Sequence, residues 1–231
     1  MIQQYKRLWM PLMAILMVFQ LTACGDKDAE NRKAFTDFLQ NTVMRGDGQV
    51  PTLSEDQRRK FGLYVSDYAI LAAFSQKMQK SVDSGLIPIM TLISQIRVPE
   101  DYILKRDMLE QSLGALSLLG QQVQSDKVQA DRAHAALKQP DDVKVIYEQA
   151  YNKIVTQPAN ELLPLLPQLT SLAQSIIQAG DFLREQGTRA TYTNGGVQLS
   201  SQQAVDQYNS MMKLIQVKQQ AVQSIHTNLL Y

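Results

Sequence analysis

The sequence has 231 residues, of which 45% are hydrophobic, with 23 basic residues against 22 acidic ones. This balance gives no electrostatic reason to bind nucleic acid or a polyanionic surface, and we exclude both as partners. Cys24 is the only cysteine, so no disulfide can form within the chain and apolar packing has to stabilise the fold.

The first 23 residues have the pattern of a signal peptide. Lys6 and Arg7 supply a positive charge, and an apolar run follows over residues 8–19. This run is shorter than the roughly 20 residues that a membrane-spanning helix needs. Pro11 and Gln20 weaken the segment further as a permanent span, because one interrupts helical hydrogen bonding and the other places an amide in hydrocarbon. We therefore interpret it as a targeting segment.

The next four residues, Leu21, Thr22, Ala23 and Cys24, resemble the lipobox of bacterial lipoproteins. That motif is a branched apolar residue, two small residues and the cysteine that takes up a diacylglyceryl group before cleavage. We predict cleavage between Ala23 and Cys24 and lipidation of Cys24, with two or three acyl chains as a stable membrane anchor. The alternative is an ordinary secretory signal beside a structural thiol.

The residues after Cys24 bear on location. In known lipoproteins an Asp directly after the lipidated Cys favours retention in the inner membrane, whereas this chain has Gly25 there and Asp26 one place later. The resemblance implies the outer membrane, facing the periplasm, rather than inner-membrane retention. We expect residues 24–31, which are short and polar, to form a lipidated tether.

Beyond the tether, apolar residues recur every three or four positions, which predicts amphipathic helices. The first is expected to stop at Gly46, and Thr52 with Glu55 resembles a capping box that opens the second. Gly85 is expected to end that second helix. Its aromatic stripe is predicted to be core, with a ligand pocket as the alternative; the stripe consists of Phe61, Tyr64, Tyr68 and Phe74.

A short helix is predicted to start at Pro88, and the step to Pro99 should break it. A long helix is expected over residues 102–139, closed by Pro140. A shorter helix should follow, capped near Asp141 or Asp142.

The most apolar helix is predicted to carry Leu162 to Leu183, with a kink or a helix start at Pro164 and Pro167. Residues 188–199 then alternate around Asn194 and Gly195, which is a strong signal for a two-residue β-hairpin turn. Ser200 or Ser201 is expected to cap the last helix, whose buried face runs from Ala204 to Leu229.

These patterns predict a mainly α fold, an antiparallel multi-helix bundle with one small β-hairpin before the last helix. We expect residues 32–231 to form a single periplasmic helical domain.

The search for chemistry gives no catalytic, cofactor or metal residues. His134 and His226 stand without ligands at metal-site spacing, and the glycines after Asn194 lie in no phosphate-binding motif. With Cys24 lipidated no thiol nucleophile remains, and no serine lies in a nucleophile elbow. Two adjacent carboxylate pairs beside boundary prolines are predicted to cap helices rather than to act as acid and base; they are Glu100 with Asp101 and Asp141 with Asp142.

A family resemblance starts with the run from Arg32 to Arg45, RKAFTDFLQNTVMR, and continues through Ile96, Arg97, Val98, Pro99 and Tyr102 and on to the Asp141, Asp142 pair. These segments resemble the enterobacterial YiaF-like lipoproteins, a family with a domain of unknown function. The resemblance implies an envelope lipoprotein with no assigned activity and no catalytic residues to carry over.

The leading functional hypothesis is therefore a non-enzymatic, lipid-anchored scaffold that binds another envelope component, a protein or peptidoglycan. The alternative is a periplasmic carrier of an apolar ligand in a helical cavity lined near Pro164 and Pro167. The hairpin at residues 188–199 is the candidate partner site, since about a dozen residues are spent where two to six would join two helices. The competing interpretation is that it only packs on the bundle.

Overall fold

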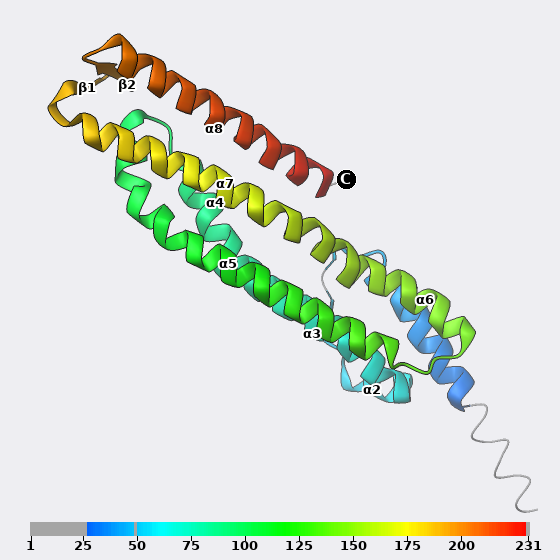
Figure 1. The fold of residues 1–231 in the computed structure, drawn as a ribbon. Helices are drawn as coiled ribbons and strands as arrows, with labels where there is room; N and C mark the ends of the chain where they lie inside the picture. Colours follow the sequence, from blue (N-terminus) through cyan, green and yellow to red (C-terminus); the bar gives the residue numbers. More distant parts are fainter. Residues whose placement is uncertain (1–26, 49, 230–231) are drawn as a thin grey trace, which may run out of the picture. The chain divides into compact units, whose positions relative to one another are not determined.

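The structure is a computed structural model that describes residues 27–48 and 50–229, with side chains described as far as Gln223. Helices dominate it, and the strands described form one antiparallel hairpin directly before the last helix, as the sequence predicts (Figure 1). The chain divides into two compact units, which are residues 1–73 with 132–154 and residues 74–131 with 155–231. We describe each unit by itself.

The first unit begins with a helix over residues 27–38 that runs into the π-helical turn η1 (Leu39–Val43). Residues 27–31 of the segment expected to form a tether are therefore helical. The reason is that this first turn has partners: Asp28 pairs with Arg32 at 3.0 Å and accepts a bond from the Tyr64 hydroxyl at 3.4 Å. The remaining elements of the unit are α2 (Glu55–Phe61), η2 (Gly62–Tyr64), the start of α3 (Val65–Ser81), the end of α5 (Pro99–Ala135), α6 (Asp141–Tyr151) and the start of η4 (Asn152–Thr156).

Aromatic rings make the core of the first unit. Phe35 stacks on Tyr64 with ring centroids 5.4 Å apart and meets Phe61 edge-on at 5.6 Å. Tyr147 is fully buried, and its hydroxyl donates a 2.8 Å hydrogen bond to the carbonyl of Asp67. The predicted aromatic stripe is thus confirmed as core, and its fourth member, Phe74 in the second unit, is buried as well.

The capping box of α2 lies two residues later than predicted. The Ser54 hydroxyl oxygen accepts a hydrogen bond from the backbone N–H of Gln57 at 3.2 Å. In return, the side-chain oxygen of Gln57 accepts one from the backbone N–H of Ser54 at 2.8 Å. Thr52 and Glu55 show the same residue types, but Ser54 is the residue with extended backbone angles before the first turn. The helix also stops at Gly62, whose φ of 55° disfavours any residue with a side chain.

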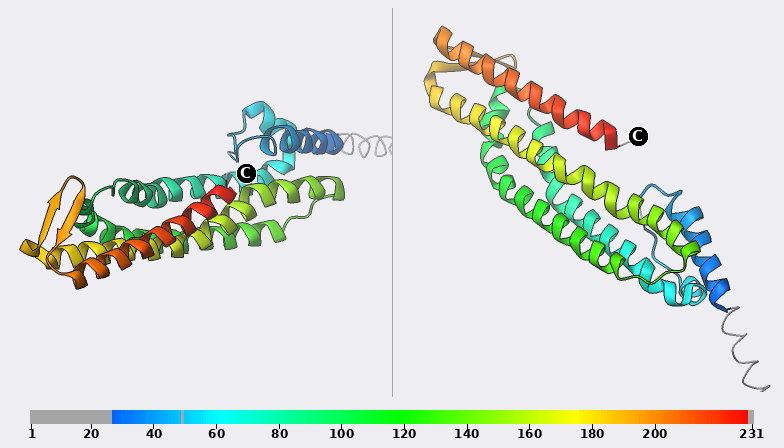
Figure 2. Two further views of the ribbon diagram at one scale, coloured as in Figure 1. Left: turned by 90° about the horizontal axis from the view of Figure 1, so that it is seen from above. Right: turned by 45° about the vertical axis from the view of Figure 1, so that its right-hand side comes forward.

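The second unit is built from long helices. Its elements are the rest of α3, η3 (Val82–Leu86), α4 (Ile87–Ser94), most of α5, the end of η4, α7 (Gln157–Gln186), η5 (Gly187–Arg189), β1 (Ala190–Thr193), β2 (Gly196–Leu199) and α8 (Gln202–Leu229). α5 and α8 each run antiparallel to α7 (Figure 2). The prediction that Gly85 ends a helix is wrong, because the π-turn η3 carries the helix through it. The side chain of Leu119 packs directly against the backbone of Gly85. A Cβ atom placed on Gly85 would lie 3.3 Å from it.

Helix α7 is the core of the second unit. It begins at Gln157, so a helix start at Pro164 or Pro167 is wrong, and both prolines lie exposed inside it. Leu165, Leu166 and Leu169 are buried on its other face. No helix in the described part of the chain is long and apolar enough to cross a membrane.

Candidate functional site

The hairpin between α7 and α8 follows its local sequence closely. Asn194 and Gly195 have φ values of 51° and 75°, and a turn with two positive φ angles matches the twist of paired strands. Ala190 pairs with Leu199 at the open end, where the Ser200 amide also bonds to the Arg189 carbonyl at 3.1 Å.

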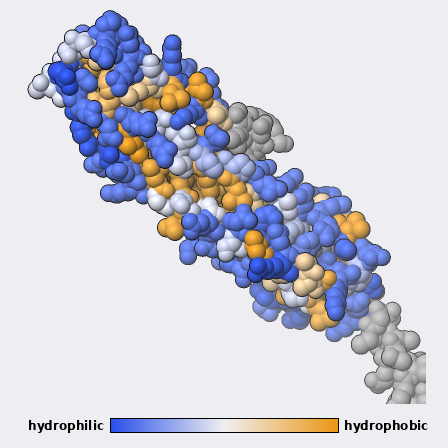
Figure 3. Space-filling model, in the orientation of Figure 1, coloured by the Kyte–Doolittle hydropathy of each residue, from blue (hydrophilic) through white to orange (hydrophobic). Residues whose placement is uncertain are grey.

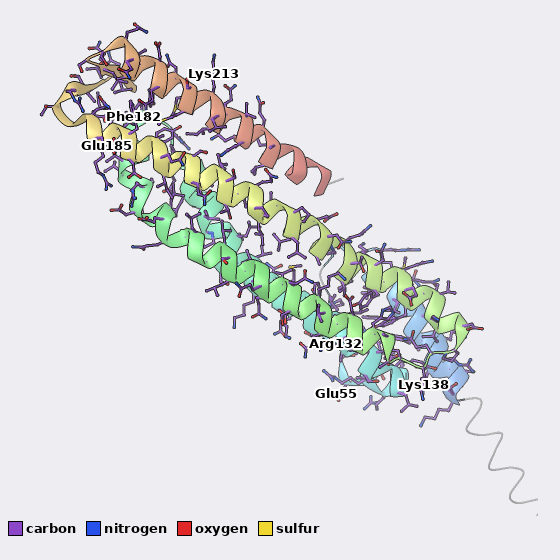
Figure 4. All side chains as sticks on the ribbon, viewed as in Figure 1. Glu55, Arg132, Lys138, Phe182, Glu185 and Lys213 are labelled. Atoms are coloured by element: carbon purple, nitrogen blue, oxygen red, sulfur yellow. The ribbon has the colours of Figure 1, made fainter. Side chains whose placement is uncertain are left out.

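The two faces of the hairpin have different surroundings. Tyr192, Val197 and Leu199 are partly buried, whereas Thr191 and Gln198 point to solvent. Val197 and Leu199 pack against a buried cluster of Phe182, Leu183 and Ala204 at the adjoining ends of α7 and α8. Figure 4 labels Phe182 of this cluster. The helices therefore supply the surface that a two-stranded hairpin needs for stability.

A hollow of about 370 Å³ opens beside the hairpin and is lined by its turn, the start of α5 and the first turns of α8. These three segments lie at the same end of the second unit (Figures 1 and 2). Its wall combines two tyrosines, one arginine, one asparagine and small or apolar residues. The lining residues are Arg97, Val98, Pro99, Tyr102, Gly195, Gly196, Val197, Leu199, Val205, Tyr208, Asn209 and Met212.

The start of α5, which forms one wall of the hollow, is held by a side-chain cap. Asp101 Oδ2 accepts the amide N–H groups of Arg97 at 2.8 Å and Val98 at 3.0 Å. These two bonds hold the pKa of Asp101 below its ordinary value. The predicted capping role is confirmed for Asp101.

The neighbouring carboxylate, Glu100, also lies in the first turn of α5, where a negative charge complements the helix dipole as predicted. Glu100 Oε2 is buried without a hydrogen-bond partner, and so is the Tyr192 hydroxyl. Burial raises the pKa of Tyr192, and the negative charge of Glu100 raises it further. Two polar groups that stay unpaired in a buried position cost stability, which marks this corner of the fold as a candidate binding region.

The tyrosines that line the hollow are neutral hydrogen-bonding groups at pH 7. Burial raises the pKa of Tyr208 to about 12, with smaller contributions from Tyr102, Tyr192 and Glu100. Burial also raises the pKa of Tyr102. The lining therefore offers neutral hydroxyl groups, which can donate and accept hydrogen bonds, beside apolar surface.

The other residues considered from the sequence lie elsewhere. Ala23 and Cys24 fall outside the described residues, so cleavage and lipidation stay predictions. His134 lies in the first unit, where it stacks on Tyr151 with ring centroids 4.0 Å apart and meets Glu148 at 3.1 Å. The side chain of His226 is outside the described part. Within the described residues no group of three or more His, Cys, Asp or Glu could hold a metal ion.

The second carboxylate pair stands where a helix begins. Asp141 and Asp142 occupy the first turn of α6, after an extended Pro140 that takes the N-cap place. Asp142 also lies 3.7 Å from Arg32. The pair therefore complements the helix dipole as predicted, without itself being the cap.

Sequence reasoning missed the hollow because its walls are distant in the chain. Tyr102 and Tyr208 are separated by about a hundred residues, and no local motif links them. The available signal was Pro99 followed by two acids, which predicted a cap but could not show that Glu100 faces the hairpin.

Comparisons with known proteins give a family without an assigned activity. Residues 12–229 match the family described as "Protein of unknown function (DUF3053)". The chain is 44% identical over 216 residues to "Uncharacterized protein YiaF" of Escherichia coli strain K12, covering 94% of this chain and 92% of that protein. The same values hold for the proteins of that name in Escherichia coli O157:H7 and Shigella flexneri. No solved structure matches the chain. The family match and these relatives show that the chain belongs to the DUF3053 family of proteins of unknown function.

Proposed function

We propose that this protein is a lipoprotein held in the outer membrane by acyl chains on Cys24, and that its periplasmic helices act as a non-enzymatic scaffold for another envelope component. The anchor is supported by the residues Leu21 to Cys24, which follow a charged and apolar targeting segment. No enzymatic family is indicated by the comparisons.

The binding role rests on one observation, the hollow beside the hairpin. It is walled by Tyr102 and Tyr208, with Asn209 and Arg97 as polar groups, and the unpaired Glu100 and Tyr192 lie in the same region. Tyrosine, arginine and asparagine are residue types that binding surfaces favour, because they combine apolar area with hydrogen bonding. The partner is an envelope protein or peptidoglycan that inserts a side chain or a sugar there.

A separate observation bears on the alternative, a carrier of an apolar ligand in a cavity near Pro164 and Pro167, and favours the scaffold. The prolines expected to open a cavity, Pro164 and Pro167, are exposed. Leu166 of the same segment packs against Gly120 of α5, and a Cβ atom placed on Gly120 would lie 3.3 Å from the Leu166 side chain. This contact packs α7 directly against α5 beside the two prolines.

The anchor is tested by metabolic labelling with a fatty-acid analogue. Cys24→Ser should lose the label and remain an uncleaved precursor, whereas Thr22→Ala, which keeps a small residue in the motif, should be labelled and cleaved normally. Undiminished labelling of Cys24→Ser would contradict the proposal.

The binding role is tested by photo-crosslinking in living cells. A photoreactive residue at Asn209, in the wall of the hollow, should capture one abundant envelope protein or should link the protein to peptidoglycan. The control is Gln174, which is exposed on α7 away from the lining. Equal products from both positions, or a lipid recovered in equimolar amount from the purified protein, would count against the scaffold.

A further inference from the structure

The first helix begins close to the proposed lipid anchor. Its first described residue is Lys27, three residues after Cys24. Three residues span at most about 11 Å when they are fully extended. With Cys24 held in a bilayer by its acyl chains, the first turn of this helix has to lie near the lipid headgroups. The inference that follows rests on this part of the proposed function.

The turn η2 lies directly beside that first turn, in the same unit. A Cβ atom placed on Gly62 would lie 2.4 Å from the side-chain nitrogen of Asn31. The Tyr64 hydroxyl donates a hydrogen bond to Asp28 at 3.4 Å. A surface that the anchor holds against residues 27–31 is therefore close to η2 as well.

Leu63 occupies the middle of η2 and lies outside the core. Its side chain is 84% exposed, which is the largest value among the big apolar side chains of the described residues. The chain turns at Gly62, and the residues on either side of the turn, Phe61 and Tyr64, are buried. Single exposed leucines are common on protein surfaces, so exposure alone assigns no role. The position of Leu63 beside the anchored end of the chain is what points to one.

The charged side chains around Leu63 suit a headgroup region. Arg58, Arg59 and Lys60 are exposed on α2, directly before the turn. Long basic side chains can place their charge among phosphates while their stems cover apolar surface. Residues 27–33 and 55–60 together carry six basic and four acidic side chains, so net charge is a minor contribution. Apolar surface is visible among hydrophilic side chains over the α2 end of the first unit (Figure 3).

We infer that Leu63 inserts into the boundary between headgroups and acyl chains of the membrane that holds Cys24, with Arg58, Arg59 and Lys60 at the level of the phosphates. The anchor favours lipid over a protein as the occupant. It keeps a bilayer within reach of η2 at all times, whereas a separate protein has to arrive by diffusion. Leu63 is then a second attachment point, and the first unit keeps one side toward the membrane instead of turning freely on its tether.

Tryptophan fluorescence of the processed, lipidated chain in vesicles tests this contact. The only tryptophan, Trp9, lies in the predicted signal peptide, so Leu63→Trp places a single reporter at the turn. In vesicles of phosphatidylcholine with brominated acyl chains, its emission should be quenched several-fold more strongly than that of Gln40→Trp. Gln40 is exposed 13 residues after Lys27, about 20 Å further along the first helix and beyond the reach of the tether.

Salt and a second quencher identify the kind of contact. Quenching by bromine in Leu63→Trp should persist at high salt, because apolar insertion is not screened, and aqueous iodide should quench this variant less than Gln40→Trp. Loss of bromine quenching at high salt would show a contact held by charge and would overturn the insertion. Shielding from iodide without quenching by bromine would assign Leu63 to a protein occupant and would also overturn it.

The failure of this contact is distinguishable from the failure of the anchor. Both positions are exposed, so circular dichroism and melting temperature should match the wild type. Fatty-acid labelling of Cys24 is measured on each preparation before reconstitution. A chain without the label would overturn the anchor and the contact together. A labelled chain in which bromine quenches Leu63→Trp no more than Gln40→Trp would overturn the contact alone.

Discussion

Gly180 of α7 lies directly against the backbone of Tyr102 at the start of α5. A Cβ on Gly180 would stand 2.4 Å from the Tyr102 carbonyl oxygen, which no real contact allows. This approach holds the wall of the hollow in place, because Tyr102 is one of its lining residues.

Gly180→Ala should therefore destabilise the fold by about 1–3 kcal/mol, since a backbone atom cannot move aside as a side chain can. The measurement is chemical denaturation followed by circular dichroism. Gly120→Ala is the matched control, because its Cβ would meet only the tip of Leu166 at 3.3 Å. A cost for Gly120→Ala equal to that of Gly180→Ala would show that backbone contact is not the cause.

The start of α5 should depend on the cap made by Asp101. Asp101→Ala removes the acceptor of two backbone N–H groups and should cost about 1 kcal/mol. Because the folded-state pKa of Asp101 is lowered, its contribution is present above the ordinary pKa of about 3.9 and is lost as the pH falls through the folded value.

Asp101→Asn separates the cap from the charge. Asparagine can still accept both bonds, so this variant should keep part of the stability at pH 7 and lose less than the wild type on acidification. Denaturation midpoints at pH 7 and pH 3 provide the comparison. An acid sensitivity of Asp101→Asn equal to that of the wild type would exclude Asp101 as its source.

Tyr208 should make the second unit sensitive to alkali. Its pKa is raised to about 12 chiefly by burial, so the folded state keeps the phenol neutral after the unfolded chain begins to ionise near pH 10. The contribution of Tyr208 is fully present below pH 10 and is lost between about pH 10 and pH 12, by up to about 2 kcal/mol. Tyr208→Phe should remove this part of the loss, measured as the pH dependence of the unfolding free energy. A variant with an unchanged alkaline profile would contradict the assignment.

The buried carboxylate of Asp126 should require its lysine. Lys77 Nζ lies 2.8 Å from Asp126 Oδ1, and the Asp126 side chain is 6% exposed. Lys77→Met should cost about 1–3 kcal/mol, less than for a fully buried pair because Lys77 is half exposed. Lys80→Met on the exposed side of α3 should have little effect.

A double variant tests whether the unpaired charge is the cause. Adding Asp126→Leu to Lys77→Met removes the charge and should recover most of the lost stability in urea denaturation. If the double variant is less stable than Lys77→Met alone, the packing of the lysine stem would be the better explanation.

Several elements could be predicted because their signals are short. The hairpin depends on Asn194 and Gly195, whose positive φ angles suit these residues, and the first turn of α6 carries Asp141 and Asp142 as predicted. The sequence misplaced features where neighbouring residues compete for one role. Ser54 and Thr52 are both good N-caps, and only the backbone angles of the folded chain select Ser54.

The helix end predicted at Gly85 was wrong for a different reason. The residue resembles a helix stop, yet the helix continues through it because Leu119 of α5 packs where its side chain would be. That contact joins residues 34 positions apart and leaves no local pattern. The helical conformation of residues 27–31 has a similar origin, since the hydroxyl of Tyr64, from a later helix, donates a hydrogen bond to Asp28.

The sequence by itself determined the helical fold class and the place of the hairpin, because each rests on residues only a few positions apart. The prediction that Cys24 is lipidated rests on such a short pattern too. Only the tertiary structure decided which side chains meet. It brought Tyr102, Tyr208 and the turn of the hairpin around one hollow, and it left Glu100 and Tyr192 buried without partners. It also buried Leu109 and Leu116 of α5 and left Leu104 and Leu118 of the same helix exposed. Packing depends on contacts between distant segments, and these become fixed only when the chain folds.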